Sequence, residues 1–249
     1  MIVLLSDRYL EEVHGLLERI RATQAEAIGA AAEAAANALA NGGGFFVGPL
    51  GHGNEGDLLS RAGGLMALRP FNFSFHLDNP VADCLKDRPR PEPFDFDLET
   101  ARLAVRASNL RAGDCLIVGS VSGRTPRPIS TAIAARDAGV TVVAITSMEY
   151  TARVESAHST GLRLCDVADI VVDNCVPYGD ACLEVEGLAA PVFPLSGIAT
   201  IVCCWMIVAG VIERLLARGL QPHVYLSVNR EGGEAFNAAQ LAEYNRLGY

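Results

Sequence analysis

Asp114-Cys-Leu-Ile-Val-Gly-Ser-Val-Ser-Gly-Arg-Thr-Pro126 is the stretch that decides the fold of this chain. Residues 116–118 form a short apolar run of the kind that a parallel sheet buries on both faces. A helical pattern follows after a tight gap, and Thr125 and Pro126 suit the N-cap and first turn of that helix. The stretch therefore predicts a strand, a loop and a helix start. Residues 119–124 are expected at the positive end of the helix, where anions bind.

The loop carries three hydroxyl side chains, on Ser120, Ser122 and Thr125. Beside the unpaired backbone N–H groups of a helix start, three hydroxyls can hold one phosphate group. The alternative is an ordinary capped turn whose serines satisfy neighbouring backbone groups and bind no ligand. The loop taken alone leaves both interpretations open.

Length and composition indicate a single α/β domain, because 249 residues with 50% hydrophobic content suit one core of ordinary size. The net charge of −9 and the absence of a long basic cluster argue against nucleic acid or a membrane surface as the main partner. Seven cysteines without a Cys-x-x-Cys pair fit reduced thiols, and Cys203 and Cys204 are expected to pack as small hydrophobic residues. No signal peptide is recognised, so a cytoplasmic protein is expected.

The flanking segments extend this unit. Residues 1–41 are expected to hold one long amphipathic helix, from about residue 6, and residues 45–47 a buried strand. Residues 70–96 have few apolar periods and several prolines, which predicts an irregular loop or lid. Arg88 and Arg90 in that loop are interpreted as solvated charges.

A glycine pattern follows the first strand, at Gly51, Gly53 and Gly56, with Asp78 further along the chain. The spacing is that of a dinucleotide-binding fingerprint, in which glycines let a pyrophosphate approach a helix start. No other motif in the sequence indicates a nicotinamide-binding site. An NAD-binding oxidoreductase is therefore kept only as the rival hypothesis. No His-x-x-x-His spacing indicates a metal site, and neither a metal nor a cofactor is expected.

The hydroxyl loop resembles the phosphosugar-binding loop of the sugar isomerase (SIS) domain family, and the resemblance covers most of residues 44 to 232. Its further motifs are Gly51-His52, Arg61-Ala-Gly-Gly-Leu65, Ser156-Ala-His158-Ser-Thr-Gly161, Leu164 to Asn174, Pro177-Tyr-Gly-Asp180, Leu183-Glu184-Val-Glu186-Gly187, Pro194-Leu-Ser196 and Tyr225 to Gly233. The chain is most similar to the small SIS proteins described as phosphosugar-binding or phosphosugar isomerase-like. In these proteins a helix follows the Gly-His loop and ends at the Arg-Ala-Gly-Gly motif.

Three departures from the family pattern concern the first loop and the segment after it, and one is that the interval to Arg61 is about two residues short of that pattern. Gly53 stands where a phosphate-binding serine is usual, so any phosphate contact there would come from backbone N–H groups and Asn54. The family's helix carries a Glu-Glu pair, whereas Gly56 and Asp57 stand here, and the shorter carboxylate of Asp57 reaches less far.

The resemblance implies a doubly wound, mostly parallel sheet of about five strands flanked by helices, a flavodoxin-like three-layer sandwich. It also implies a phosphorylated or otherwise anionic monosaccharide as ligand and aldose-ketose isomerisation as the reaction. A non-catalytic phosphosugar sensor and an amino-sugar phosphate lyase are the alternatives. The candidate residues for proton transfer are Glu184, His158, Glu186, His52 and Asp57. The candidates for ligand binding are Gly51, His52, Gly53, Asn54, Ser120, Ser122, Gly123, Arg124, Thr125, Ser147 and Ser196.

Residues 189–212 contain no charged residue, a length that would span a bilayer. Prolines and glycines interrupt the run, so the prediction is a buried helix within residues 189–219 rather than a membrane span. Its apolar residues run around more of the helix than one sheet face covers: Ile198, Ile201, Val202, Trp205, Met206, Val208 and Ala209. A homodimer or homotetramer with this helix at the interface is therefore expected, without membrane or nucleic acid partners.

Overall fold

The structure is a computed structural model that describes residues 4–89 and 94–249. At its centre lies a sheet of five parallel strands in the order β2-β1-β3-β4-β5. These strands are β1 (Phe45–Val47), β2 (Leu68–Pro70), β3 (Cys115–Gly119), β4 (Thr141–Thr146) and β5 (Ile170–Asp173). The order is that of flavodoxin-like doubly wound sheets, which confirms the predicted fold class.

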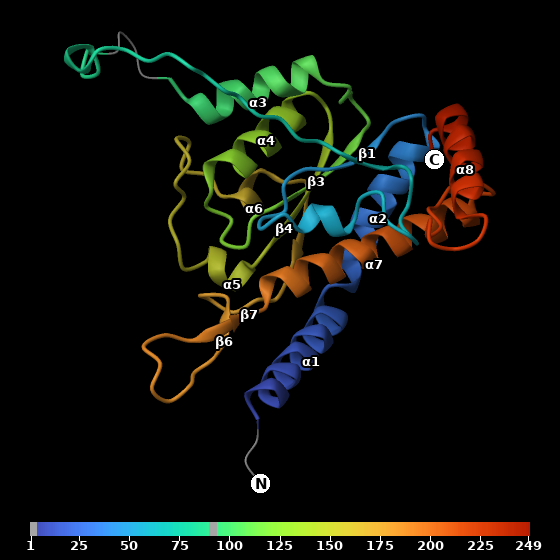
Figure 1. The fold of residues 1–249 in the computed structure, drawn as a ribbon, viewed down its shortest axis with the longest axis horizontal. Coiled ribbons are helices and arrows are strands. Elements are labelled where there is room, and N and C mark those ends of the chain that lie inside the picture. The colour runs from blue at the N-terminus through green and yellow to red at the C-terminus, as the bar shows by residue number, and fades with distance from the viewer. Residues whose placement is uncertain (1–3, 90–93) are drawn as a thin grey trace.

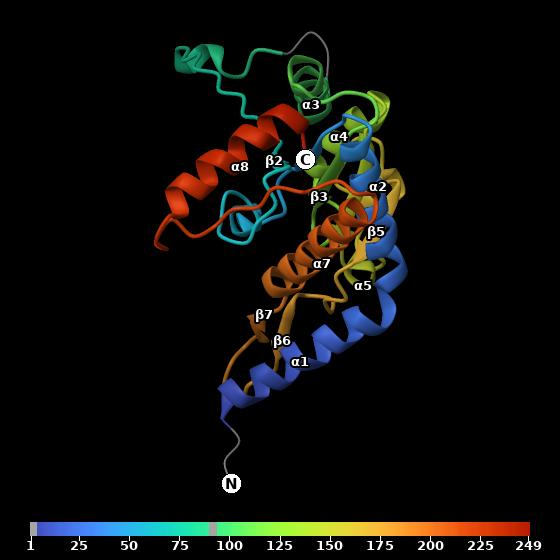
Figure 2. The same cartoon turned by 90° about the vertical axis from the view of Figure 1, so that its right-hand side faces the viewer.

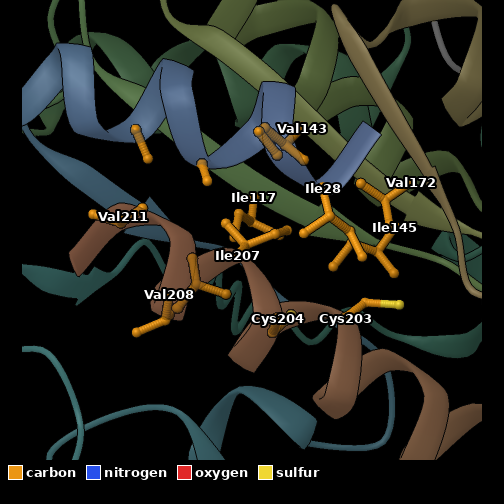
Figure 3. Packing of buried hydrophobic residues seen from close by; sticks show 14 of the residues in the cluster. Ile28, Ile117, Val143, Ile145, Val172, Cys203, Cys204, Ile207, Val208 and Val211 are labelled. Carbon is orange, nitrogen blue, oxygen red and sulfur yellow. The ribbon is translucent and has the colours of Figure 1, made fainter. Parts of the chain in front are cut away.

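Helices cover both faces of the sheet (Figure 1). On one face α2 (Ala25–Ala40) and α7 (Ser196–Ala217) pack against Ile117, Val143 and Ile145, as Figure 3 shows. On the other face α3 (Phe96–Ala107), α4 (Pro126–Asp137) and α6 (Leu164–Val167) pack with the alternate residues of the same strands. Because both faces are covered, β3 is buried throughout, as its continuous apolar run predicts.

The thiols in these layers pack as apolar groups. Cys115, Cys203 and Cys204 are fully buried. Burial raises the pKa of Cys115 and of Cys203 to about 12. These thiols therefore stay protonated at neutral pH, and the prediction that Cys203 and Cys204 act as small hydrophobic residues is confirmed.

The N-terminal segment is two helices rather than the single helix predicted. α1 (Leu5–Thr23) ends at Gln24, whose backbone leaves the helical region, and α2 begins at the next residue. The Gln24 side chain accepts a hydrogen bond of 3.0 Å from the N–H of Asp173, at the end of β5. This tertiary contact lets α2 lie on the sheet, while α1 runs out beside the hairpin of β6 (Ala181–Leu183) and β7 (Val192–Pro194) (Figure 2).

The glycine loop after β1 leads into a single 3-10 turn, Asn54–Asp57, rather than into the helix that the family resemblance implies. Gly51 and Gly53 have positive φ angles of 82° and 74°, so the chain turns sharply before that segment. With no α-helix starting here, the loop lacks the helix N-terminus on which a dinucleotide fingerprint depends.

The segment after β2 is irregular, as predicted. A 3-10 turn, Asp83–Leu85, interrupts it before α3, and Figure 1 shows this stretch extending away from the sheet. The Arg88 side chain donates to the carbonyl of Leu85 and is otherwise at the surface. Arg90 lies outside the described residues.

The charge-free segment forms two different elements. Residues 189–195 contain strand β7, and the helix begins only at Ser196. By length and composition α7 could cross a membrane. However, 44% of its most apolar stretch is buried inside the protein, where the helix packs along α2 and the sheet. Of the apolar residues that run around this helix, Val208 is only 2% exposed and belongs to the core, so it lies on the covered side of α7. α5 (Met148–Thr151) and α8 (Gly233–Leu247) complete the chain.

Candidate functional site

A cavity of about 410 Å³ opens at the carboxyl ends of β1 and β3. The sheet order reverses between these two strands, and ligands of open α/β sheets bind at such a switch point. Among the sequence-predicted residues, those that line the cavity are Gly51, His52, Ser120, Ser122 and Thr125. The lining also includes three polar residues that were not among the predicted site residues: Arg127, Tyr150 and Asp180.

Two buried hydroxyls determine how the loop after β3 faces the cavity. Thr146 Oγ1 donates to the carbonyl of Val121 at 3.2 Å, and Thr151 Oγ1 donates to the carbonyl of Ser122 at 3.2 Å. Both loop carbonyls thus point back toward β4 and α5. In a trans peptide the N–H points opposite to the carbonyl, so the N–H of Ser122 points away from these hydroxyls. Within residues 4–89 and 94–249, that N–H and the Ser122 hydroxyl have no protein partner.

The donors for an anion come from the loop more than from the first turn of α4. Thr125 occupies the N-cap position, as predicted, but its side chain makes no capping hydrogen bond. Its Oγ1 instead accepts from Ser120 Oγ at 3.5 Å. Pro126 and Pro128 have no N–H, so Arg127 is the first residue of the helix that offers one.

Gly123 lies behind the loop rather than in the cavity wall. Its φ angle is 65°, and a Cβ there would come within 2.7 Å of Thr151 Oγ1. The position therefore requires glycine for both conformation and space. The neighbouring Arg124 side chain turns away and donates to the carbonyl of Glu155 at 3.0 Å.

Arg127 supplies a positive charge at the cavity. Its guanidinium donates to the carbonyl of Phe73 and lies 4.8 Å above the centre of that ring. The contact ties the cation to the segment that follows β2. An anion held by the loop would thus have a full charge nearby as well as neutral donors.

Tyr150 forms an aromatic wall. Its ring centre lies 4.9 Å from that of Tyr178. Ser147, a predicted ligand residue, is fully buried and caps α5 by accepting from the N–H of Tyr150 at 3.0 Å, while its hydroxyl donates to the carbonyl of Val176 at 2.6 Å. Ser147 therefore positions Tyr150 and does not itself reach the cavity.

Ser196 has a comparable supporting role. Its hydroxyl donates to Asp180 Oδ2 at 2.7 Å, and its N–H donates to Asp180 Oδ1 at 2.8 Å. The carboxylate of Asp180 thereby caps the start of α7, and Asp180 is also among the residues that line the cavity.

The remaining residues of the first loop lie outside the cavity lining. Gly53 precedes the 3-10 turn in a left-handed conformation, and Asn54 begins that turn, with its side-chain oxygen close to Gly197. Asp57 pairs with Arg61 and accepts from Trp205 Nε1 at 3.4 Å. Asp57 thus fastens the turn to α7.

His158 is buried in a hydrogen-bonded turn behind α4. The N–H of Thr160 donates to its Nδ1 at 3.2 Å, so Nδ1 is the unprotonated nitrogen, and Nε2 donates to Ser130 Oγ at 2.9 Å. The adjacent Ser159 hydroxyl donates to Asp95 and holds the pKa of that carboxyl below its usual range. The turn therefore connects α4 to the start of α3, and His158 has no open nitrogen for a substrate.

Glu184 and Glu186 line a second hollow, of about 350 Å³, formed by residues 184–191 in the β6–β7 hairpin. None of the described residues that line the first cavity takes part in it. The two glutamates are thus separated from the hydroxyl loop. In the described part of the chain, no cluster of three or more His, Cys, Asp or Glu side chains could hold a metal ion.

Sequence reasoning missed Arg127, Tyr150 and Asp180 for different reasons. Arg127 stands two residues after the last loop hydroxyl, between two prolines, and its position could have been noticed. Tyr150 and Asp180 enter the cavity from later segments, and only the fold brings them to β3.

Comparison with known proteins gives two kinds of likeness. A family model described as SIS domain matches residues 8–147. A UPF0309 protein of Caldanaerobacter subterraneus is 37% identical over 248 residues, covering 96% of this chain and 97% of that protein. A UPF0309 protein of Thermoanaerobacter pseudethanolicus is 36% identical over 244 residues, covering 96% of each. A phosphoheptose isomerase from Neisseria gonorrhoeae superposes with a TM-score of 0.55 at 17% identity, covering 84% of this chain and 100% of that one, a likeness of fold.

Proposed function

The chain belongs to the SIS domain family, and on that premise we propose that it binds a phosphorylated monosaccharide and interconverts its aldose and ketose forms. We further propose that the whole chain is one SIS domain. The observation that carries the proposal is the loop after β3, whose hydroxyls line the cavity while its carbonyls are tied back. The structural neighbour named phosphoheptose isomerase is, by its name, an enzyme of a sugar phosphate.

The phosphate would bind at Ser120, Ser122 and Thr125. Hydroxyls and the N–H of Ser122 would donate to its oxygens, and Arg127 would offset its charge. The sugar would extend along Tyr150, because the apolar C–H face of a pyranose or open-chain sugar packs well on an aromatic ring. A volume of about 410 Å³ is within the range of small-molecule sites.

His52 is the candidate for proton transfer that lines this cavity. Isomerisation moves a proton between two adjacent carbons of the open-chain sugar, and a neutral imidazole can accept it from one carbon and return it to the other. His52 is exposed on a turn with a φ angle of 52°, so its ring can approach a bound ligand. Glu184, Glu186, His158 and Asp57 lie elsewhere in this fold.

A phosphosugar-binding protein without turnover is the second candidate function. One observation favours it: of the five residues that the sequence suggested for proton transfer, only His52 lines the cavity. Both functions use the hydroxyl loop to bind phosphate, and they differ only in whether a reaction follows binding.

The test is a panel of sugar monophosphates, screened by thermal shift and followed by NMR for interconversion. Ser122→Ala should weaken binding by about 1 to 3 kcal/mol, the scale of hydrogen bonds to a charged group, without loss of stability. Ser6→Ala, an exposed serine in α1, is the matched control and should change neither property. Unchanged affinity together with lower stability in Ser122→Ala would show that the loop is an ordinary capped turn. Binding without interconversion would favour the second candidate.

A further inference from the structure

We propose that Asp180 selects the substrate class, accepting monophosphorylated sugars that present a hydroxyl or ammonium donor and rejecting those with a second anionic group. The inference rests on the proposed function and concerns the same cavity. It starts from the fact that Asp180 is the one carboxylate among the described residues that line this cavity.

The carboxylate of Asp180 is largely but not completely occupied by protein donors. Oδ1 accepts the N–H groups of Leu195 and Ser196 at 3.1 and 2.8 Å, and Oδ2 accepts the hydroxyl of Ser196 at 2.7 Å. An ionised carboxylate has about four acceptor positions and no donor. One position on Oδ2 therefore remains, and only a donor group can use it.

The backbone holds this carboxylate in place. Asp180 has a φ angle of 68°, in the left-handed region, and its N–H donates to the carbonyl of Pro177 at 3.0 Å. Because its oxygens also cap the start of α7, the side chain cannot turn away without freeing the N–H of Ser196, whereas the N–H of Leu195 would keep the main-chain carbonyl of Asp180 as acceptor, at 3.3 Å. An approaching ligand thus meets a fixed negative charge.

The residues that line the cavity consequently carry charges of both signs. The loop hydroxyls and Arg127 suit the phosphate, whereas Asp180 suits a sugar hydroxyl or an amino group. A ligand with a carboxylate or a second phosphate at its other end would bring like charges together, and such repulsion discriminates against the wrong partner. Bisphosphates and the phosphates of sugar acids are therefore excluded.

The experiment compares glucose 6-phosphate with 6-phosphogluconate, which share the phosphate and carbon chain but differ by a carboxylate. We expect the wild type to bind glucose 6-phosphate at least about tenfold more tightly, and Asp180→Asn to reduce that ratio by about tenfold. The asparagine keeps an oxygen for the two N–H groups and an amide for Ser196, so α7 keeps its cap. Circular dichroism and the melting temperature check that the variant is folded.

Glu149→Gln is the matched control. It removes a negative charge beside Tyr150 but outside the cavity, where Glu149 pairs with Arg153 at 3.1 Å and accepts from the N–H of Tyr178 at 3.3 Å. Its ratio should equal that of the wild type. An equal preference of the wild type for both ligands, or an unchanged ratio in Asp180→Asn, overturns the role of Asp180 while the proposed function stands. If the wild type binds neither compound nor inorganic phosphate, the proposed function itself fails and the inference falls with it.

Discussion

Gly123 shows how a single residue maintains the conformation of the hydroxyl loop. Its φ angle is 65°, and a Cβ at this position would lie 2.7 Å from Thr151 Oγ1, so an alanine here would meet both backbone strain and a steric clash. We expect Gly123→Ala to lower the free energy of unfolding by about 2 to 4 kcal/mol and to weaken phosphate binding, because the Thr146 and Thr151 hydroxyls must move. Urea denaturation and calorimetric titration measure the two effects.

Gly161→Ala is the control that separates the effect of backbone strain from that of a steric clash with the added Cβ. Gly161 has a similar φ angle of 72°, but a Cβ there would have no neighbour within 4 Å. Its alanine variant should cost about 1 kcal/mol and leave binding unchanged. If the two variants lost the same stability, the contact with Thr151 would contribute nothing to the loop.

At the residue scale, the sequence predicted those site residues that lie close together in the chain. Ser120, Ser122 and Thr125 share one loop with its strand and helix, so their spacing already places them together. Asp180 could not be found in this way, because its place in the cavity depends on how residues 174–180 return from β5 to the start of α7. His158 fits a family motif, yet its ring nitrogens are engaged by Ser130 and Thr160, which no spacing shows.

At the scale of elements, α2 and α7 cross in close contact at a small residue. A Cβ on Gly210 would lie 2.8 Å from the Cβ of Ala32, whereas a Cβ on Gly29 would meet only the Arg214 guanidinium, at 3.6 Å. Gly210→Ala should therefore destabilise the protein by about 1 to 3 kcal/mol, because the two helices must separate. Gly29→Ala should stabilise it by up to about 1 kcal/mol, because alanine favours the helix. Thermal and urea unfolding of both variants checks the opposite signs, and a gain of stability in Gly210→Ala would contradict the packing.

Element boundaries were less predictable than element types. The break at Gln24 depends on a hydrogen bond from Asp173, about 150 residues away in the chain, so the helical pattern of residues 6–41 runs through it without a signal. The 3-10 turn at Asn54–Asp57 is held by Trp205 of α7. In both places a tertiary contact decides a local conformation.

At the scale of the whole molecule, the sheet order places the hydroxyl loop where ligands of doubly wound folds bind, between β1 and β3. The cavity walls from β1 and β3 follow from the flavodoxin-like fold that the family resemblance implied. The remaining wall, with Tyr150 and Asp180, comes from segments beyond β4 and β5. A cytoplasmic location and the absence of a nucleic acid partner stay predictions.

The outer face of α7 is the basis of the last prediction, that the protein assembles into a homodimer or homotetramer. Ile198 is 37% exposed, Leu216 is 50% exposed, and Ala209 between them is exposed as well. The exposed Glu213 also lies on this face, between Ala209 and Leu216, and the apolar residues around it are covered either by a membrane or by protein. Because the other side of α7 packs on α2 and the sheet, insertion into a bilayer would remove the helix from its own core. A second copy of the chain is the occupant that leaves the fold intact.

Ala209→Arg is the substitution that tests this assembly, and Val208→Arg is its internal control. Arginine at the exposed Ala209 should split the oligomer and leave the monomer folded, because the charge can reach water. Arginine at Val208, which is only 2% exposed, should unfold the protein by burying an unpaired charge among Ile207 and Val211. Light scattering of detergent-free protein gives the mass, and circular dichroism distinguishes dissociation from unfolding. A folded wild-type monomer at micromolar concentration would rule out the α7 interface.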